Sequence, residues 1–404
     1  MSLVIGTPRV LILALSNWIG APRLPRAFQR AGFHVSTFAF SGLLIQRSQA
    51  VDEALLLSEA ISNDALLEAL LAAIERTRPD IVVPTDDACI ILLHAAAAQA
   101  RRASAVPQTR AVLEASLGNI QHLPTVRSRK LLANLAASIG VRAPRHGVVF
   151  SEAEALAFAA EHGYPIVLKE EDSVAGMGVS ICKNEAELAA AALRCRRNPE
   201  IFAAGVLVQT FIAGRTAMRV VVAQGGRVLG GLSALKLETW PTSTGPSTCV
   251  ELFENPELTA TAEAVVAALG YSGFASLDFM VEADGKAHLI ELNPRPTPIT
   301  HLGERFGACL CRHLHSALTG QPTSATQPRG LPSRVALFPQ EWVRDPNSPH
   351  LAAGVFHDAP WDEPDLVEAY TVFGRGQMRF AGYRALGYRS EDLRRKLAEL
   401  EKSA

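Results

Sequence analysis

Short apolar runs alternate with amphipathic helical stretches over the first 120 residues, and this alternation constrains the fold more than any other feature. RVLILAL at 9–15, FHVSTFAF at 33–40 and IVVP at 81–84 are largely apolar at successive positions, as strands buried on both faces are. ALLEALLAAIERT at 65–77 has the spacing of an amphipathic helix. Alternating strands and helices predict a doubly wound parallel sheet, so we assign residues 1–120 to an N-terminal α/β domain.

The pattern changes after residue 120. MRVVVAQGGRVLGGLSAL at 218–235 and FASLDFMVEADGKAHLIEL at 274–292 are apolar runs interrupted by short turn signals, which is typical of hairpins. Residues 121–320 therefore form a second, α+β domain with mainly antiparallel sheets. A Pro-rich stretch at 321–332 reads as a linker, so we assign 321–404 to a C-terminal segment that packs on the second domain.

Composition excludes several classes of protein. The net charge is −1, so no strongly basic surface indicates a nucleic-acid partner, and no apolar run approaches the length of a membrane span. VLILALSNW near the start is too short for a signal peptide. Six cysteines without CxxC spacing predict reduced thiols, so we expect a cytoplasmic protein.

One hairpin carries acidic residues in an otherwise apolar setting. Asp284-Gly285 predicts a two-residue turn, and this register places Asp278 directly opposite Glu291, with Asn293 on the same face. Facing carboxylates repel unless a proton or cation lies between them, and together with an amide oxygen they suit Mg²⁺ or Mn²⁺. A solvated hairpin whose acids face water is the alternative, and the apolar residues around them argue against it.

Two further stretches suggest nucleotide contacts. VLKEEDSVAGMGVSICK at 167–183 ends a buried strand on Lys169 and continues into a loop containing Gly176 and Gly178, whose amides and lysine suit phosphate oxygens. VLVQTFIAGR at 206–215 suits a hinge that reads an adenine edge. Judged alone, the first also fits a plain hairpin and the second an ordinary strand end.

Three elements follow one another along the chain: the lysine and glycine loop at 167–183, the stretch at 206–215 and the acidic hairpin. In this order along the chain they resemble the ATP-grasp superfamily, over about residues 5–320. ELNPR at 291–295 closely matches the family's E-x-N-x-R signature. The resemblance implies an ATP-grasp fold preceded by a biotin carboxylase-type N-terminal domain, with 140–210 as a mobile lid subdomain. It also implies ATP and Mg²⁺ (or Mn²⁺) as cofactors, and substrate pockets in the loops 16–23, 236–249 and 295–303.

The resemblance implies three groups of site residues. The nucleotide would be held by Lys169, Ser173, Ala175, Gly176, Met177, Gly178, Gln209, Thr210, Phe211 and Ile212. The metal ions would be held by Asp278, Glu291 and Asn293, while Arg295, Arg219 and Lys236 would stabilise the reacting groups. Both Arg219 and Lys236 are also compatible with surface cations on a sheet, and Lys236 is the weaker candidate of the two.

The chain departs from the family pattern at several positions. The family uses a lysine at the start of the helix after the N-terminal domain, where this chain has Arg129 followed by Lys130, and which of them takes that place stays open. The glycine loop has fewer glycines than usual, and Gln209 stands where an acid is common.

These residues together predict an enzyme, an ATP-dependent carboxylate–amine ligase. A substrate carboxylate would form an acyl phosphate, and an amine would then displace the phosphate to give an amide or peptide-like bond. The partners are therefore small-molecule carboxylates and amines. A bicarbonate-activating carboxylase and a non-catalytic nucleotide-binding protein are the alternatives. For the C-terminal segment, covering the grasp domain and supporting a homodimer both stay open.

Overall fold

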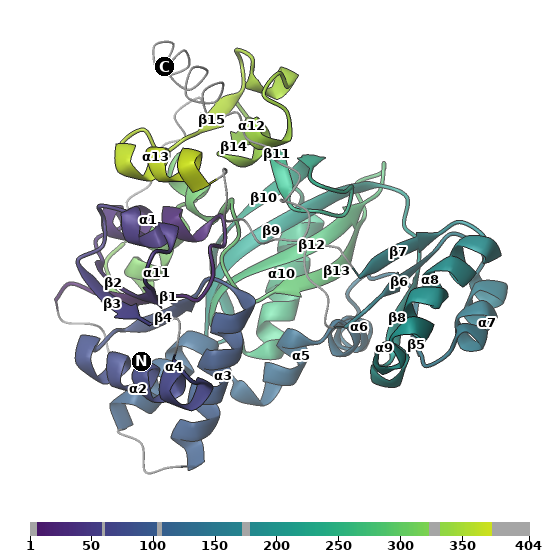
Figure 1. Ribbon diagram of the computed structural model, residues 1–404, viewed down its shortest axis with the longest axis horizontal. Coiled ribbons are helices and arrows are strands. Elements are labelled where there is room, and N and C mark those ends of the chain that lie inside the picture. The colour runs from purple at the N-terminus through teal and green to yellow at the C-terminus, as the bar shows by residue number, and fades with distance from the viewer. Residues whose placement is uncertain (1–5, 59–60, 103–106, 172–177, 323–331, 374–404) are drawn as a thin grey trace.

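The computed structural model describes residues 6–58, 61–102, 107–171, 178–322 and 332–373. Three sheets form its framework, with four, seven and four strands. Figure 1 shows the N-terminal sheet at the left, the seven-stranded sheet in the centre and the smaller sheet at the right. A parallel sheet followed by mainly antiparallel sheets confirms the predicted fold class.

The N-terminal domain is built on a parallel sheet in the order β3-β2-β1-β4. Its strands are β1 (Arg9–Ala14), β2 (His34–Phe40), β3 (Glu53–Leu57) and β4 (Ile81–Pro84). Helix α1 (Leu24–Arg30) covers one face, whereas α2 (Asn63–Thr77), α3 (Asp87–Arg102) and α4 (Pro107–Leu117) cover the other. The sheet is therefore doubly wound, as predicted. The sequence analysis missed β3, a five-residue edge strand that is only partly buried.

The central sheet has the order β13-β12-β9-β10-β11-β14-β15. Its strands are β9 (Arg215–Gln224), β10 (Arg227–Thr239), β11 (Ser247–Leu252), β12 (Gly273–Val281), β13 (Ala287–Asn293), β14 (Arg334–Leu337) and β15 (Phe356–Asp358). Helix α10 (Pro256–Leu269) packs on one face, together with the short helices α5 (Leu123–Arg127) and α6 (Arg129–Ser138). Helices α1 and α11 (Leu310–Thr319) pack on the other face.

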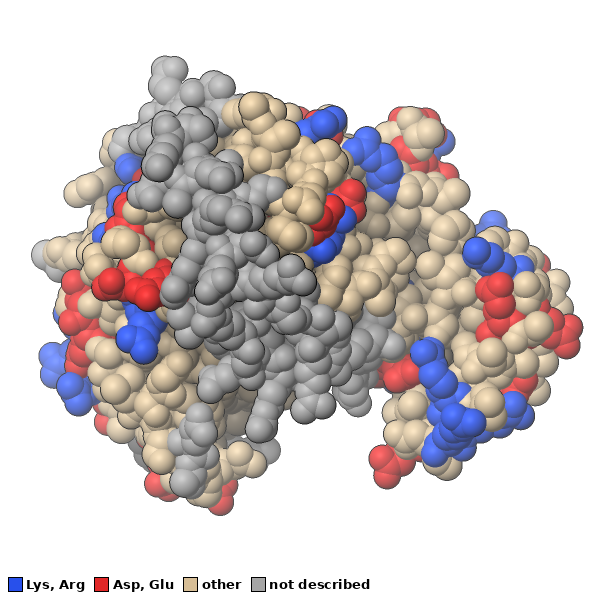
Figure 2. All heavy atoms as spheres, turned by 45° about the horizontal axis from the view of Figure 1, so that its top comes forward, with Lys and Arg blue, Asp and Glu red and all other residues tan. Residues whose placement is uncertain are grey.

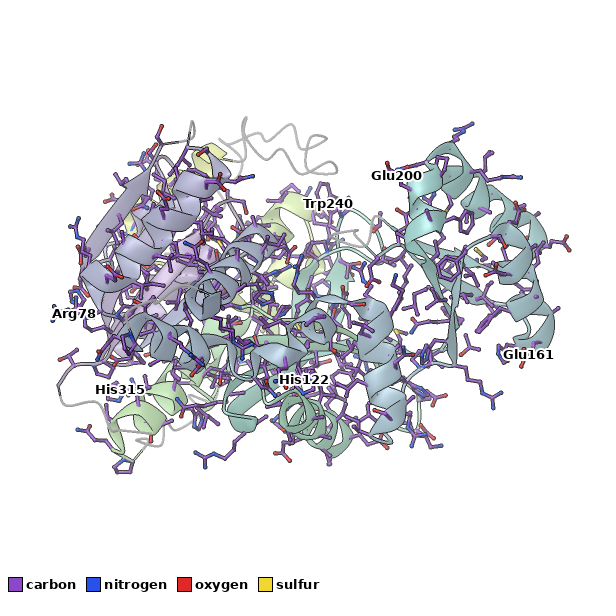
Figure 3. The ribbon with its side chains drawn as sticks, turned by 90° about the horizontal axis from the view of Figure 1, so that it is seen from below. Arg78, His122, Glu161, Glu200, Trp240 and His315 are labelled. Atoms are coloured by element: carbon purple, nitrogen blue, oxygen red, sulfur yellow. The ribbon has the colours of Figure 1, made fainter. Side chains whose placement is uncertain are left out.

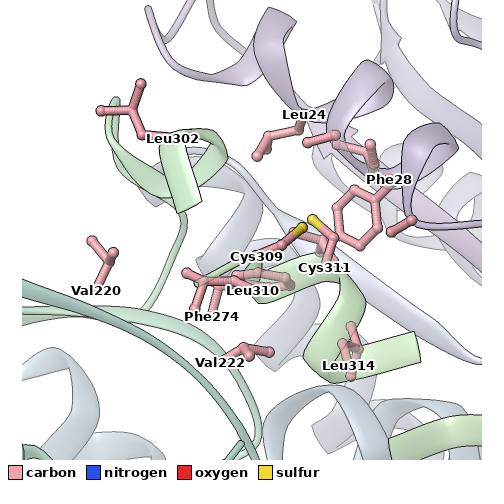
Figure 4. Packing of buried hydrophobic residues seen from close by; sticks show 14 of the residues in the cluster. Leu24, Phe28, Val220, Val222, Phe274, Leu302, Cys309, Leu310, Cys311 and Leu314 are labelled. Carbon is pink, nitrogen blue, oxygen red and sulfur yellow. The ribbon is translucent and has the colours of Figure 1, made fainter. Parts of the chain in front are cut away.

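The N-terminal domain and the central sheet share one core. In Figure 4, Leu24 and Phe28 of α1 meet Val220, Val222 and Phe274 of the sheet, and α11 fills the space between them. The rings of Phe28 and Phe274 stand edge to face, with centroids 5.7 Å apart. This continuous packing fixes the carboxyl edge of the parallel sheet against the end of the central sheet.

The small sheet has the order β5-β8-β6-β7, and we refer to it and its helices as the lid, after the subdomain predicted at 140–210. Its strands are β5 (His146–Val149), β6 (Ile166–Lys169), β7 (Val179–Cys182) and β8 (Val206–Thr210), which lie within the predicted limits of 140–210. One face packs on α7 (Glu152–His162), α8 (Glu185–Arg197) and α9 (Pro199–Ala204). Ser151 caps α7, since its hydroxyl accepts from the Glu154 N–H. Figure 2 shows the lid as a separate lobe at the right, divided from the body by a notch.

The C-terminal segment extends the central sheet as well as covering it. It contributes β14 and β15, followed by α13 (Pro364–Phe373), while α12 (Gln340–Arg344) lies between the two strands. Trp342 and Tyr370 form a buried cluster with Leu44 of the N-terminal domain. Buried Asp358 accepts from Arg23 at 3.1 Å and pairs with His301 at 2.9 Å, so three parts of the chain meet at this carboxylate. Residues 374–404 lie outside the described part of the segment.

The helices within the described ranges include none that is long and apolar enough to cross a membrane.

Candidate active site

The β12–β13 hairpin brings the two predicted metal-binding carboxylates together. Asp278 pairs with Glu291, and Ser276 pairs with Asn293. The predicted pairing is confirmed, but the predicted two-residue turn is wrong. The Glu282 N–H donates to the Lys286 carbonyl, so the loop has three residues. A bulge at 290 then restores the expected register beyond it.

The carboxylates lie on the face of the sheet that α10 does not cover. Leu277 and Phe279 on β12 pack in the α10 core, as do Leu289 and Leu292 on β13. Asp278 lies between the first two along its strand, so its side chain points to the opposite face.

Three cations surround the two carboxylates. The Lys236 ammonium is 2.8 Å from Asp278 Oδ2, and the Arg129 guanidinium donates to Glu291 Oε1 through Nη2 at 2.9 Å and Nε at 3.2 Å. Lys169 on the lid is the third, since both carboxylates interact with it electrostatically. Three positive charges against two negative charges make this face attractive to an anion.

Burial changes the ionisation of Lys169. The pKa of its ammonium falls to about 8, mainly because burial removes hydration; Arg129 also lowers this pKa, whereas Glu291 and Asp278 raise it. The side chain is buried at the carboxyl end of β6, and its pair Leu207 on β8 shares its face. Lys169 therefore reaches the site from the lid.

Arg129 also joins the body of the protein to the lid. Its Nη1 donates to the carbonyl oxygens of Glu170 at 2.6 Å and Glu171 at 3.0 Å, where the chain leaves β6. The Ser128 hydroxyl caps α6 and donates to the Glu171 carboxylate. Lys130 points away from the site, because its ammonium donates to the Ala204 carbonyl at 2.6 Å. Of the two alternatives left open by the sequence, Arg129 reaches the carboxylates.

The predicted nucleotide-binding residues occupy different parts of the lid. Gln209 is buried and pairs with Val167, so it shares the face of Lys169, whereas Thr210 pairs with Ile166 of the lid core. Phe211 and Ile212 follow the strand, and Phe211 is exposed. The Gly178 carbonyl accepts from the Glu170 N–H at 3.0 Å and closes the base of the β6–β7 hairpin. Ser173, Ala175, Gly176 and Met177 lie outside the described residues.

Arg295 turns from the end of β13 toward the N-terminal domain. Its Nε donates to Asp87 Oδ1 at 2.9 Å, and its guanidinium lies 4.3 Å from the ring centroid of Trp18. The side chain is 7% exposed, so these contacts nearly enclose it. The sequence analysis assigned no role to Asp87, whereas Trp18 lies in the predicted substrate loop at 16–23. The acids that end the IVVPTDD stretch were a signal that could have drawn attention to Asp87.

The structure does not bring Arg219 to this site. Arg219 pairs with Leu277 on one side and with Ser233 on the other, and it donates to the Ser233 hydroxyl at 2.8 Å. It therefore lies on the α10 face, where Glu254 and Glu263 are its acidic neighbours. The sheet separates it from Asp278. Lys236, the weaker candidate from sequence, contacts Asp278 directly.

The tip of the β10–β11 hairpin lies close to the same region. Trp240 follows the last residue of β10, four positions after Lys236. Seen from below in Figure 3, Trp240 lies between the bulk of the body and the lid, whose outer helices carry Glu161 and Glu200. The predicted substrate loop at 236–249 therefore begins beside the carboxylates.

The oxygen atoms of this site fit a hard divalent cation. Asp278, Glu291 and Asn293 lie on one face of two paired strands and offer carboxylate and amide oxygens. Over the described residues, no group of three or more His, Cys, Asp and Glu side chains is suited to a metal. Two carboxylates and an amide leave room in an octahedral shell for water or phosphate oxygens, as Mg²⁺ prefers. The residues present therefore fit magnesium bound together with a phosphorylated ligand.

Comparison with known proteins identifies the domain that carries this site. A family profile described as the ATP-grasp domain matches residues 129–298. The chain is 28% identical over 187 residues to the carbamoyl phosphate synthase large chain of Thermotoga neapolitana, covering 44% of this chain and 16% of the relative. It is 28% identical over 144 residues to the D-alanine–D-alanine ligase of Geobacter sulfurreducens, covering 33% of this chain and 44% of the relative. The chain thus spans less than half the length of either relative.

Solved structures show the same fold. The biotin carboxylase domain of 2-oxoglutarate carboxylase from Hydrogenobacter thermophilus, in complex with MgADP, ADP and bicarbonate, aligns with a TM-score of 0.58 at 18% identity. The alignment covers 81% of this chain and 72% of that structure. The L-amino acid ligase of Bacillus licheniformis aligns with a TM-score of 0.54 at 17% identity, covering 78% and 75%. Residues 129–298 of the chain therefore carry an ATP-grasp domain.

Proposed function

We propose that this protein is an ATP-dependent ligase that activates a carboxylate as an acyl phosphate for attack by an amine. One observation carries the proposal: Asp278 and Glu291 face each other on the open side of the sheet, with Lys169, Arg129 and Lys236 around them. Oxygen ligands for a divalent ion and cations for phosphate oxygens are thus combined at one place. The D-alanine–D-alanine ligase relative supports the choice of reaction.

The lid and the body would hold the nucleotide between them. Lys169 and Arg129 would attract phosphate oxygens, and the residues along β8 and just after it, Gln209, Thr210, Phe211 and Ile212, would hold the adenine and ribose. Asp278, Glu291 and Asn293 would hold Mg²⁺ or Mn²⁺, which neutralises charge on the phosphates when bound. The residues 173–177 and Gly178 complete the phosphate side of the proposal.

The ion pairs of the site suggest how its charges are balanced before a nucleotide binds. Unpaired carboxylates in a partly buried site are costly, and Arg129 and Lys236 neutralise Glu291 and Asp278 in the structure described here. A triphosphate offers both cations stronger partners, so each can turn toward phosphate oxygens. The carboxylate oxygens then become available as ligands, and the net positive charge of the site falls.

Arg295 would stabilise the transferring phosphoryl group. Its Nε edge is held by Asp87, and its terminal nitrogens make no hydrogen bond to the residues that the structure describes. A guanidinium fixed along one edge keeps its remaining donors oriented, which is what a transition state with charge on several oxygens requires. The substrate carboxylate attacks the γ-phosphorus, the bond to the bridging oxygen breaks and ADP leaves.

A bicarbonate-activating reaction is the second candidate. Carbamoyl phosphate synthase relatives and the aligned biotin carboxylase domain favour it. The two candidates differ in the carboxylate that is phosphorylated, so an assay with defined donors separates them.

The test is a coupled ADP-release screen with Mg²⁺, using pairs of carboxylates and amines and, separately, bicarbonate. We expect ADP release to require both a carboxylate and an amine, and Glu291→Gln to abolish it. Glu282→Gln, an acid at the far end of the same hairpin, is the matched control and should retain turnover. Turnover by Glu291→Gln at saturating Mg²⁺ would refute the site. ADP release with bicarbonate alone would favour the second candidate.

The proposal also includes the cellular environment of the enzyme and its assembly. All six cysteines are free and buried, which supports a reducing, cytoplasmic environment. A homodimer is proposed for the assembly, and sedimentation of the purified chain tests it.

A further inference from the structure

Two neighbouring acids follow β4, and they have different environments. Asp86 is buried and accepts hydrogen bonds from the N–H groups of Leu15 and Ser16, the Ser16 hydroxyl and the Cys89 N–H, at 2.9–3.0 Å. These contacts tie the loop after β1 to the start of α3, so Asp86 has a structural role. Asp87 makes none of them, and its side chain is 53% exposed.

Asp87 instead forms one side of an incomplete polar site with Arg295. Only Oδ1 of Asp87 is engaged, by the Arg295 Nε at 2.9 Å. Its Oδ2 and the terminal nitrogens of Arg295 make no hydrogen bond within the described part of the chain. Arg295 is more than nine-tenths buried, and its contacts with Trp18 and Asp87 hold the guanidinium in place, although its terminal nitrogens are not among the buried atoms that lack a partner. A guanidinium that is fixed in this way and has open donors can receive an anionic ligand.

The closeness of the two side chains restricts what can complete the site. A ligand that satisfies both must present an anion to Arg295 and a cation to Asp87, only a few ångströms apart. A simple carboxylate or bicarbonate leaves Asp87 Oδ2 without a partner. An α-amino acid carries its ammonium and its carboxylate on a single carbon, so it fits both groups at once.

We propose that Asp87, Arg295 and Trp18 form an amino-acid subsite, in which Asp87 binds the α-ammonium of the donor whose carboxylate is activated. This inference deepens the proposed function and rests on it. Arg295 follows Asn293 by two residues, so the subsite begins at the end of the strand that carries Glu291 and Asn293. Asp87 thereby makes the N-terminal domain the source of donor specificity.

The test compares donors that differ only in the ammonium: phenylalanine against phenylpropionate, and alanine against propionate. Hydroxylamine replaces the amine substrate and traps the acyl phosphate as a hydroxamate, so the donor is measured without a natural acceptor. Asp87→Asn keeps an oxygen for the Arg295 Nε–H but removes the charge. Asp64→Asn, an exposed first-turn acid of α2, is the matched control.

We expect at least one amino acid to react well and its counterpart without the ammonium to react poorly. Asp87→Asn should lower kcat/KM for amino acids by about 10- to 100-fold, as loss of a charged hydrogen bond does. Asp87→Asn should change kcat/KM for the donor without the ammonium by less than about threefold. Asp64→Asn should have the same kcat/KM values as the unaltered protein. Equal use of both donors, or selectivity that survives in Asp87→Asn, would overturn the subsite and leave the ligase proposal intact.

Calorimetric measurement of amino-acid binding distinguishes a failure of the subsite proposal from a failure of the ligase proposal. Amino-acid binding that depends on Asp87, without ADP release from any donor, would support the subsite and refute the ligase. If no amino acid binds or reacts, the subsite is refuted.

Discussion

Lys169 should make nucleotide binding depend on pH in a range where an ordinary lysine does not titrate. Burial lowers the pKa of its ammonium from 10.5 to about 8 in the nucleotide-free protein. Phosphate oxygens favour the charged form, so they raise this pKa when a nucleotide binds. Nucleotide binding is therefore coupled to proton uptake by Lys169 above pH 8.

The size of the effect follows from the fraction of Lys169 that is protonated. With a pKa of about 8, roughly nine-tenths of the side chains are charged at pH 7 and roughly one-tenth at pH 9, so ADP affinity should fall about 10-fold. The free energy of unfolding without nucleotide changes in the opposite direction. Between pH 8 and 10.5 the unfolded chain holds the extra proton on Lys169, so this group makes stability rise with pH.

Calorimetric titration with ADP from pH 7 to pH 9, without divalent ions, measures the predicted change. Lys169→Arg is the control, because a guanidinium stays charged throughout, and its affinity should remain nearly constant over this range. Lys169→Met should bind weakly at every pH. An affinity of the unaltered protein that is flat across the range would refute the assignment of Lys169 to the phosphates.

Three further predictions concern other parts of the molecule. Lys236→Met should lower kcat/KM for ADP release about 100-fold, whereas Arg219→Met, on the opposite face of the sheet, should change it less than about threefold; steady-state kinetics decide, and equal losses would contradict the placement. Trp342→Ala should lower the free energy of unfolding, measured by urea denaturation, by about 3–5 kcal/mol, because it leaves a cavity in the core that joins the C-terminal segment to the sheet. A loss below about 1 kcal/mol would show that this core contributes little to stability. Ser128→Ala should cost about 1 kcal/mol in the same assay by removing the cap of α6, and an unchanged midpoint would contradict the capping role.

The sequence predicted the elements that depend on local patterns. The alternation of the first 120 residues was enough for the doubly wound sheet. The facing of Asp278 and Glu291 was also predicted, but two local departures compensate each other: the turn has three residues, and the bulge at 290 shifts the register back. An odd number of such departures would have placed Glu291 on the other face.

Features that depend on pairing between segments far apart in the chain could not be predicted from the sequence. Arg219 and Asp278 lie on β9 and β12, which pair directly although two strands and α10 separate them in sequence. No turn fixes that register, so the side of the sheet on which Arg219 lies could not be read from spacing. Asp87 was missed for the same reason, because its partner Arg295 is 208 residues away.

The central claim is that Asp278 and Glu291 bind a divalent ion that links the protein to the nucleotide phosphates. Its most direct test is the affinity of a non-hydrolysable ATP analogue, measured by calorimetry with and without Mg²⁺. We predict that Mg²⁺ tightens binding to the unaltered protein, and that Asp278→Asn and Glu291→Gln bind the metal-free analogue but gain little from Mg²⁺. Variants that gain as much from Mg²⁺ as the unaltered protein would contradict the claim.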